Sequence, residues 1–143
     1  MRMAITATRR VQFAAGHRVH GHEGKCRHLH GHNFVAFLTA AAENLDAVGR
    51  VIDFGVLKER IGGWIEREWD HGFVVWRDDA EALRALDGVE GQKTYLLPAN
   101  PTAENLADHL LRVVGPQTLA GTGVRLVKVT IHETENGIAE ATL

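Results

Sequence analysis

Alternating apolar and polar residues predict two β-strands in the first third of the chain. From Ile5 to Phe13 the apolar residues fall on odd positions, and from His30 to Ala42 the even positions place His30, His32, Phe34, Ala36 and Leu38 on one side. A period of two is typical of strands with one buried face. If the first strand continues, His17 shares its apolar face, while His30 and His32 project from the apolar face of the second. We therefore expect these three imidazoles to lie near one another.

A spacing of three to four residues predicts two amphipathic helices in the middle of the chain. Asp53 is a typical N-cap, and apolar residues follow it on one helical face until about Trp69. Asn100-Pro101 begins the second helix, with proline at the first helical position, and Gly115-Pro116 ends it. The buried faces are expected to contain Phe54, Leu57, Ile61, Trp64 and Ile65 in the first helix, and Ala103, Leu106, Leu110, Val113 and Val114 in the second.

Two further strands are predicted near the C-terminal end, at Val124–Glu133 and Ile138–Thr142. Asn136-Gly137 between them is the dipeptide preferred in a type I′ hairpin turn. The resulting order is ββααββ, an α+β fold in a single domain spanning residues 1–143. Between the helices, the patterns for a short helix at Asp79–Leu86 and a short strand at Thr94–Leu97 are too weak to decide.

Composition places the chain among ordinary globular proteins. Of its 143 residues 45% are hydrophobic and 24% are charged, and the formal net charge is −2. This charge gives no electrostatic reason to expect nucleic acid or an anionic membrane as a partner. The stretch from Met1 to Thr6 lacks the apolar run of a signal peptide, and no segment approaches the ~20 apolar residues of a membrane span. We therefore expect a cytoplasmic protein.

Six of the nine histidines lie between His17 and His32. Three imidazoles leave a coordination position open on zinc, which is the arrangement of a catalytic site rather than a structural one. His17, His30 and His32 are the candidate ligands, although His28 shares the parity of the last two and competes with them. His20 and His22 are assigned to the loop. The alternative is that these histidines lie at the surface or are hydrogen-bonded without a metal.

The chain has one cysteine, Cys26, and so cannot form an internal disulfide. Glycine and the charged residues Lys25 and Arg27 surround it, which favours partial exposure and a thiolate that acts as a base or nucleophile. The alternative is a small buried hydrophobic residue, the usual state of a free cysteine.

Three other side chains are candidates for chemistry. In Asp70-His71 a carboxylate stands beside an imidazole and can fix its tautomer for proton transfer, although the dipeptide alone is a weak signal. Glu133 continues the apolar face of Val127, Val129 and Ile131, where a charge needs a partner such as a ligand with N–H donors. If the strand has already ended, Glu133 lies in solvent. The residues His109, His132, Thr102 and Glu104 are interpreted as structural, surface or helix-capping residues.

Five motifs occur in an order that closely resembles the 6-pyruvoyltetrahydropterin synthase superfamily. They are Phe13-Ala14-Ala15-Gly16-His17, Cys26-x-x-x-His30-Gly31-His32, Asp70-His71, Pro101-Thr102-Ala103-Glu104-Asn105 and His132-Glu133-Thr134. The spacing from the cysteine to His-Gly-His resembles the bacterial 6-carboxytetrahydropterin synthase branch of the queuosine pathway. The resemblance implies a T-fold, with an antiparallel sheet, two helices on one face and a barrel formed by several subunits. It also implies a homohexamer, a dimer of trimers, with active sites at subunit contacts.

The resemblance also implies a role for each candidate residue. His17, His30 and His32 would bind Zn²⁺, which polarises hydroxyls of the substrate side chain. Cys26 would accept a proton, Asp70 and His71 would form a second proton-transfer pair, and Glu133 would anchor the pterin. The implied reaction converts 7,8-dihydroneopterin triphosphate into 6-carboxy-5,6,7,8-tetrahydropterin, acetaldehyde and triphosphate.

Two alternatives remain open at the level of the sequence. One is a sister activity, 6-pyruvoyltetrahydropterin synthesis or a related pterin side-chain cleavage. The other is a metal-binding module without catalysis, for which the histidine-rich loop alone is enough. Three imidazoles also suit iron, nickel or copper. Gly16 replaces a common alanine, Gly72 replaces a common polar residue, and the segment from Trp76 to Pro98 is longer than in compact relatives, all of which concern the pocket rim.

Overall fold

The predicted strands form the centre of one curled, mixed sheet. The computed structural model describes residues 5–143. The four predicted strands are β1 (Thr6–His17), β2 (His30–Ala42), β5 (Val124–His132) and β6 (Ile138–Thr142). They pair antiparallel as β1-β2-β5-β6, and in β1 and β2 the register places His17 opposite His30 and Ala15 opposite His32. The predicted α+β order ββααββ is confirmed for these elements.

The region between the two helices adds two strands and a helix to this plan. They are β3 (Gly72–Trp76), α3 (Ala80–Asp87) and β4 (Thr94–Leu97). Both short strands run parallel, β3 beside β1 and β4 beside β3, so the sheet order within residues 5–143 is β4-β3-β1-β2-β5-β6. The helix and strand left undecided are therefore present. The strand β3 was not predicted, because Gly72–Trp76 contains no alternation of apolar and polar residues.

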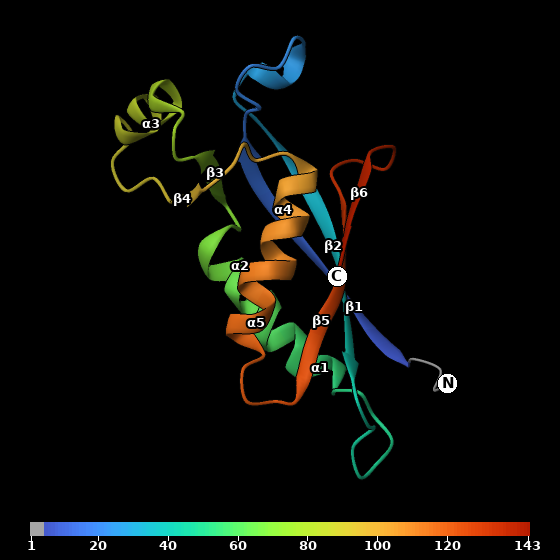
Figure 1. The fold of residues 1–143 in the computed structure, drawn as a ribbon. Helices are drawn as coiled ribbons and strands as arrows, with labels where there is room; N and C mark the ends of the chain where they lie inside the picture. The colour runs from blue at the N-terminus through green and yellow to red at the C-terminus, as the bar shows by residue number, and fades with distance from the viewer. Residues whose placement is uncertain (1–4) are drawn as a thin grey trace.

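Two long helical runs cover one face of the sheet (Figure 1). The first consists of α1 (Phe54–Leu57), the π-helical stretch η2 (Lys58–Gly62) and α2 (Gly63–Glu68). The second consists of α4 (Ala103–His109), the π-helical stretch η3 (Leu110–Val114) and α5 (Gly115–Thr118). Figure 1 also shows α3, β3 and β4 at one side of this layer, and the loop joining β1 to β2 beyond the ends of those strands.

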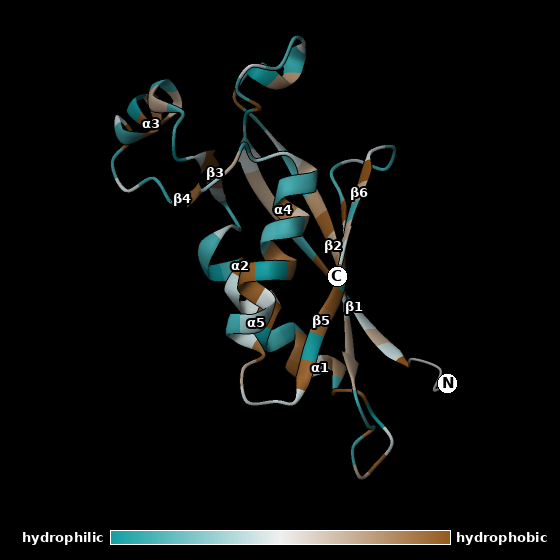
Figure 2. Cartoon of the chain, in the orientation of Figure 1, coloured by the Kyte–Doolittle hydropathy of each residue, from teal (hydrophilic) through white to brown (hydrophobic). Residues whose placement is uncertain are grey.

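The hydrophobic core lies between the sheet and the helices. Figure 2 shows hydrophobic residues along β5 and on the neighbouring parts of the helices. Complete burial of each large aliphatic side chain stabilises the fold by about 1.5–3 kcal/mol. The residues with at most 2% exposure include Phe13, Phe34, Leu38, Leu57, Ile61, Ile65, Trp69, Leu106, Leu110, Leu111, Val129 and Ile131.

Several predicted helix boundaries need correction. Asp53 caps the first helix as predicted, but Phe54 is 54% exposed and lies outside the buried face. The second helix begins at Ala103 with Thr102 as N-cap, so Pro101 precedes the helix instead of beginning it. It continues past Gly115-Pro116 to Thr118. Because η3 interrupts the α-helical hydrogen bonding, Pro116 stands in the first turn of a new α-helical segment, where its missing N–H is tolerated. Within the predicted stripe Val113 is 48% exposed, and Leu111 is buried instead.

The C-terminal hairpin forms, but with a different turn and a different buried face. His132 pairs with Ile138, which leaves five residues in the loop, and neither Asn136 nor Gly137 has the positive φ that a type I′ turn requires. The Thr134 hydroxyl instead accepts hydrogen bonds from both their N–H groups. A register shift between Thr39 and Ala40 of β2 changes the alternation in β5, so Leu126 is buried in place of Val127.

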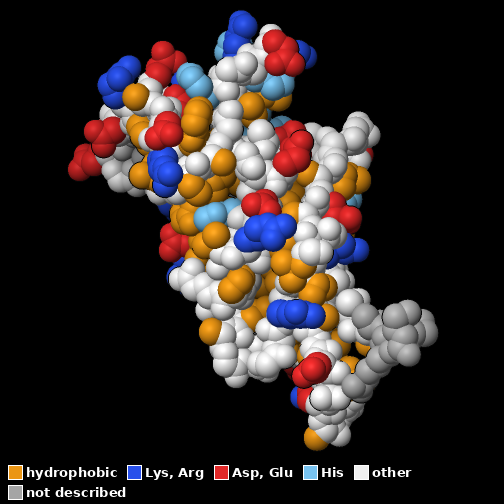
Figure 3. Space-filling model, viewed as in Figure 1, with side chains coloured by type: hydrophobic (Ala, Val, Ile, Leu, Met, Phe, Trp, Pro, Cys, Tyr) orange, Lys and Arg blue, Asp and Glu red, His pale blue; other side chains and the backbone are white. Residues whose placement is uncertain are grey.

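The described surface carries charges of both signs. In Figure 3 the acidic and basic side chains are scattered over the visible face, with histidines gathered at the end where β1 meets β2. Within residues 5–143 each helix is too short or too polar to cross a bilayer. The signal-peptide prediction concerns residues 1–6, most of which lie outside the described residues.

Candidate active site

Three histidines at one end of the β1–β2 pair form a compact cluster. His17 is the last residue of β1, and His30 and His32 stand at the start of β2 on the face that also carries Phe34. One potential ligand atom from each histidine lies within 4.8 Å of the other two. The ring centroids are 4.6–5.2 Å apart. The antiparallel register therefore brings together the three residues that the alternation predicted.

Backbone carbonyls fix which nitrogen of two rings faces the cluster. The Nδ1 of His17 lies 2.6 Å from the Pro101 carbonyl, and the Nδ1 of His30 lies 2.6 Å from the His28 carbonyl. A carbonyl accepts hydrogen bonds, so Nδ1 is the protonated nitrogen in the neutral form of each ring, and Nε2 is the nitrogen that can bind a metal. This carbonyl–imidazole arrangement is typical of metal-binding histidines.

The cluster fits a metal ion. Among the described residues, the Nε2 atoms of His17 and His32 are buried without a hydrogen-bond partner, a state that costs about 1–3 kcal/mol for each group. Burial lowers the pKa of His17, partly offset by its hydrogen bond to Pro101, and burial also lowers the pKa of His32. Both rings are therefore neutral at pH 7, as ligands must be. His28 contributes its carbonyl, and its imidazole is not part of this cluster.

Glu133 reaches the same cluster from the end of β5. One carboxylate oxygen, Oε1, lies 3.5 Å from the Nε2 of His17 and 3.8 Å from the Nε2 of His32. The side chain is 25% exposed, so Glu133 is not the solvated strand-end residue that the sequence left as an alternative. Since both contacts use Oε1, the second oxygen remains available to a donor outside the cluster.

Cys26 lies in the loop that joins His17 to His30. It is half-buried in a short 3-10 turn, η1 (Lys25–Arg27), and its carbonyl accepts a hydrogen bond from Val19 N–H at 2.7 Å. The partial exposure predicted for Cys26 is confirmed. In the part of the chain that the structure describes, its thiol makes no hydrogen bond with the histidine cluster or with Asp70-His71.

Contacts with distant elements hold the beginning of this loop. Asp79, which is 2% exposed, accepts two hydrogen bonds from the Arg18 guanidinium at 2.7 and 2.5 Å. The side-chain amide of Asn100 pairs with both backbone groups of His20, at 3.0 and 2.8 Å. The loop is thus attached to α3 and to the segment before α4. Sequence reasoning missed these partners, because no local pattern links residues 60 to 80 positions apart.

Asp70 and His71 form a hydrogen-bonded pair in the turn between α2 and β3. The Asp70 carboxylate accepts from the Nδ1 of His71 at 2.8 Å and from the backbone N–H of Ala14 at 2.9 Å. Burial alone raises the pKa of Asp70, but the hydrogen bonds from Ala14 and His71 and the nearby charges of His71 and Lys93 outweigh it and lower that pKa overall. The carboxylate is therefore ionised at neutral pH and holds the His71 proton on Nδ1.

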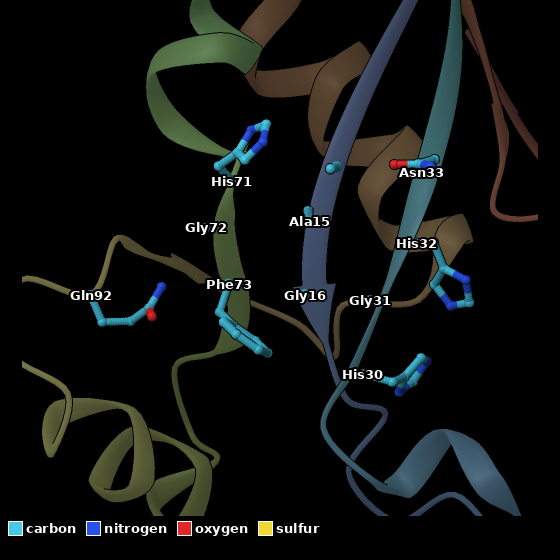
Figure 4. A pocket seen from close by; sticks show the side chains of 11 residues that line it. Ala15, Gly16, His30, Gly31, His32, Asn33, His71, Gly72, Phe73 and Gln92 are labelled. Atoms are coloured by element: carbon cyan, nitrogen blue, oxygen red, sulfur yellow. The ribbon is translucent and has the colours of Figure 1, made fainter.

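Within one chain the two groups of candidate residues stand apart. Figure 4 shows β1 and β2 between His71 on one side and the imidazoles of His30 and His32 on the other. Atoms of His30, His32 and His71 all line one open cavity of roughly 480 Å³, which extends around this end of the strands. Phe73 and Gln92 also line it, and no motif in the sequence indicated either residue. A ring stacked close to the backbone explains Gly16, because a Cβ there would lie 2.4 Å from the Phe73 ring.

Comparison with known proteins covers nearly the whole chain. The profile of the family described as 6-pyruvoyl tetrahydropterin synthase matches residues 6–142. The 6-carboxy-5,6,7,8-tetrahydropterin synthase of Rickettsia bellii is 40% identical over 136 residues, which span 95% of this chain and 99% of that protein.

Two solved structures share the fold. Caenorhabditis elegans 6-pyruvoyl tetrahydropterin synthase superposes with a TM-score of 0.69 at 26% identity, covering 100% of this chain and 99% of that one. An uncharacterized protein from Wolinella succinogenes reaches a TM-score of 0.80 at 21% identity, covering 99% of each chain. These structures confirm the α+β T-fold.

Proposed function

Because this chain belongs to the 6-pyruvoyl tetrahydropterin synthase family, we propose that it is a 6-carboxy-5,6,7,8-tetrahydropterin synthase. The substrate would be 7,8-dihydroneopterin triphosphate, and the products 6-carboxy-5,6,7,8-tetrahydropterin, acetaldehyde and triphosphate, in the queuosine pathway. The name carried by the Rickettsia bellii relative supports this choice over the sister activities. The observation that carries the proposal is the convergence of His17, His30, His32 and the Glu133 carboxylate at one point.

His17, His30 and His32 would hold Zn²⁺ through their Nε2 atoms. When bound there, zinc supplies Lewis-acid polarisation of the hydroxyls on the substrate side chain. The carbonyls of Pro101 and His28 orient the first two rings through their Nδ1–H groups. Two observations support this assignment. The Nε2 atoms of His17 and His32 are buried without a hydrogen-bond partner, and three imidazole nitrogens are a ligand set that suits zinc.

Glu133 would bind the pterin ring. An ionised carboxylate accepts two N–H donors, and the amino group and ring N–H of a pterin present such a pair on one edge. Both contacts with the histidines use Oε1, which leaves Oε2 out of the cluster, and this arrangement and the partial exposure of Glu133 support this role. Binding of the ring at Glu133 places the side chain of the substrate near the histidine cluster.

Two separate groups would move protons. Cys26 would accept one as a thiolate from the loop above the cluster, and His71 would carry the other on its ring, with Asp70 stabilising the charged form. A reaction that shifts hydrogens along a side chain with two adjacent hydroxyls needs both carriers at different carbons.

We further propose that the working site is shared between subunits of a homohexamer, a dimer of trimers in the cytoplasm. Its support is the separation of His71 from the imidazoles of His30 and His32 within one chain. A neighbouring copy would then bring its Asp70-His71 pair to the cluster. Such a site is incomplete in a monomer, which ties activity to assembly.

The first experiment is to incubate zinc-loaded protein with 7,8-dihydroneopterin triphosphate and identify the products by mass, trapping acetaldehyde separately. A 6-carboxy pterin with acetaldehyde supports the proposal. A 6-pyruvoyl or 6-hydroxymethyl product moves the enzyme to a sister activity, and untouched substrate favours a metal-binding module. The Cys26→Ala variant should lose turnover while keeping its zinc content and assembly, and normal turnover would remove Cys26 from the mechanism.

A further inference from the structure

Few contacts fix the orientation of the His71 imidazole in the turn that carries Asp70 and His71. The His71 side chain is 81% exposed, and its contact with Asp70 is the hydrogen bond that orients the ring. His71 also has a φ of 59°, an uncommon conformation for a residue with a side chain. The direction of the ring therefore depends on how firmly this turn and the Asp70 backbone are fixed.

The ammonium group of Lys93 forms hydrogen bonds with the backbone of this turn and of the preceding helix. Its Nζ donates to the carbonyl of Asp70 at 2.6 Å and to the carbonyl of Glu66, in the last turn of α2, at 2.8 Å. Carbonyls at a helix C-terminus lack partners within the helix, and a cation there also interacts favourably with the helix dipole. One side chain from the segment before β4 thus joins the end of α2 to the residue that orients His71.

The neighbouring backbone is shaped to admit Lys93. A Cβ at Gly72 would lie 2.9 Å from the Cγ of Lys93 and 3.0 Å from its carbonyl oxygen, so glycine lets the lysine stem lie against the turn. The Lys93 carbonyl accepts from Phe73 N–H at 3.0 Å and from the side-chain amide of Gln92 at 2.8 Å. In Figure 4, Gln92 lies beside the His71–Phe73 segment. This packing explains the glycine at position 72, because a side chain there would collide with Lys93.

We propose that Lys93 is a positioning residue for the His71 proton carrier, acting through the Asp70 backbone and the start of β3. This inference rests on the proposed function. Lys93 is not among the residues that line the cavity, and its ammonium bonds to backbone carbonyls instead of the His71 ring, so it would affect proton transfer rather than substrate binding. Removing its two hydrogen bonds frees the turn, and a misplaced proton carrier slows the step that needs it.

The test compares Lys93→Met, Lys93→Arg and wild-type enzyme in steady-state kinetics with the assembled, zinc-loaded protein. Lys93→Met should lower kcat on the order of 10- to 100-fold while KM changes less than about twofold. Lys93→Arg keeps two donors and should recover most of the loss. Lys128→Met is the matched control, because Lys128 is 43% exposed on β5 and should leave turnover unchanged. Unchanged kcat in Lys93→Met, or loss that Lys93→Arg does not recover, would overturn the proposal.

A second readout separates this proposal from the proposed function. The ring ¹⁵N shifts of His71, assigned by comparison with His71→Asn, should show the Nδ1–H tautomer in wild type and a mixture of tautomers in Lys93→Met. This measurement needs no turnover, so it stands even if wild-type protein leaves the pterin untouched. Identical ring shifts in both proteins would refute a positioning role. If Lys93→Met does not assemble, Lys93→Gln, which keeps a donor, replaces it in both assays.

Discussion

Replacing Arg18 by methionine tests whether an ion pair holds the start of the histidine-rich loop. Arg18 follows the candidate ligand His17, and its guanidinium binds both oxygens of the buried Asp79 carboxylate. Methionine keeps much of the side-chain volume and removes the charge. The Asp79 carboxylate, 2% exposed, then lies buried without its opposite charge, although it still accepts from Ala82 N–H at 3.2 Å.

The expected loss of stability is about 3 kcal/mol, the lower end of the range for removing one partner of a buried ion pair. The lower end applies because Arg18 is itself 15% exposed and because Ala82 still supports the carboxylate. A chain of this size has a urea dependence of about 2 kcal/mol per molar, so the unfolding midpoint should fall by about 1.5 M at fixed protein concentration. Emission from the buried Trp69 reports the transition.

The pH dependence gives the sign of the effect. The hydrogen bond from Arg18 lowers the pKa of Asp79 below its ordinary 3.8. A depressed carboxyl pKa stabilises the fold above the unfolded-state value, and this contribution disappears as pH falls through the folded-state value. The difference in unfolding free energy between wild type and Arg18→Met should therefore have its full size at pH 7 and become smaller below about pH 4. The neutral partner variant Arg18→Met/Asp79→Asn should be more stable than Arg18→Met alone.

Two results would refute this reasoning. One is an Arg18→Met midpoint within about 0.25 M of wild type, equivalent to roughly 0.5 kcal/mol. The other is a gap that stays constant down to pH 3, which would show that the carboxylate charge is not the cause. If the ion pair also holds the loop, Cys26 should react faster with a thiol reagent in Arg18→Met.

Three further predictions concern the site. His32→Ala should lower zinc content, because it removes one of three converging imidazoles. His28→Ala keeps the backbone carbonyl that orients His30 and should bind zinc like wild type. Metal analysis after dialysis measures both. Because burial lowers the pKa of His17, the metal-free protein should lose stability as pH falls below 6.5, where the unfolded chain takes up a proton that the native ring resists, and equal urea midpoints at pH 7.5 and 5.5 would contradict this. Random co-assembly of inactive Cys26→Ala and His71→Ala chains should restore about a quarter of wild-type activity if each site combines two subunits, and no recovery would place both residues in one chain's site.

The elements with strong local periodicity could be predicted from the sequence. The four predicted strands and both long helical runs follow from alternation or helical spacing, because each buries one face against the same core. The cap Asp53 was also readable, since its side chain accepts a hydrogen bond from the Gly55 N–H two residues away. These are local interactions, so they are encoded within a few residues of sequence.

Features that depend on distant partners could not be read in this way. The strand β3 is defined by its parallel pairing with β1, and the extension of the second helix to Thr118 depends on packing in which Gly115 lies against Leu126. A Cβ at Gly115 would stand 2.9 Å from Leu126. Periodicity carries no information about such contacts, because the partners are separated along the chain.

For the site, the sequence by itself determined which residue types are available and on which strand face they lie. Three such features can be read directly from the amino-acid sequence. They are the equal parity of His30 and His32, the adjacency of Asp70 and His71, and the family motifs. The assignment of these residues to zinc and catalysis stays a prediction. Their proximity depended on the register of β1 against β2, which the alternation constrains because a slip of one residue would bury the polar face.

Only the tertiary structure decided how these side chains are oriented and charged. The carbonyls of Pro101 and His28 select the ring nitrogens, and the end of β5 brings Glu133 to the cluster. Lys93 reaches the turn of Asp70 across 23 positions of sequence. Hydrogen bonds and desolvation act over a few ångströms in space, so the protonation and direction of a site residue depend on neighbours that only the folded chain supplies.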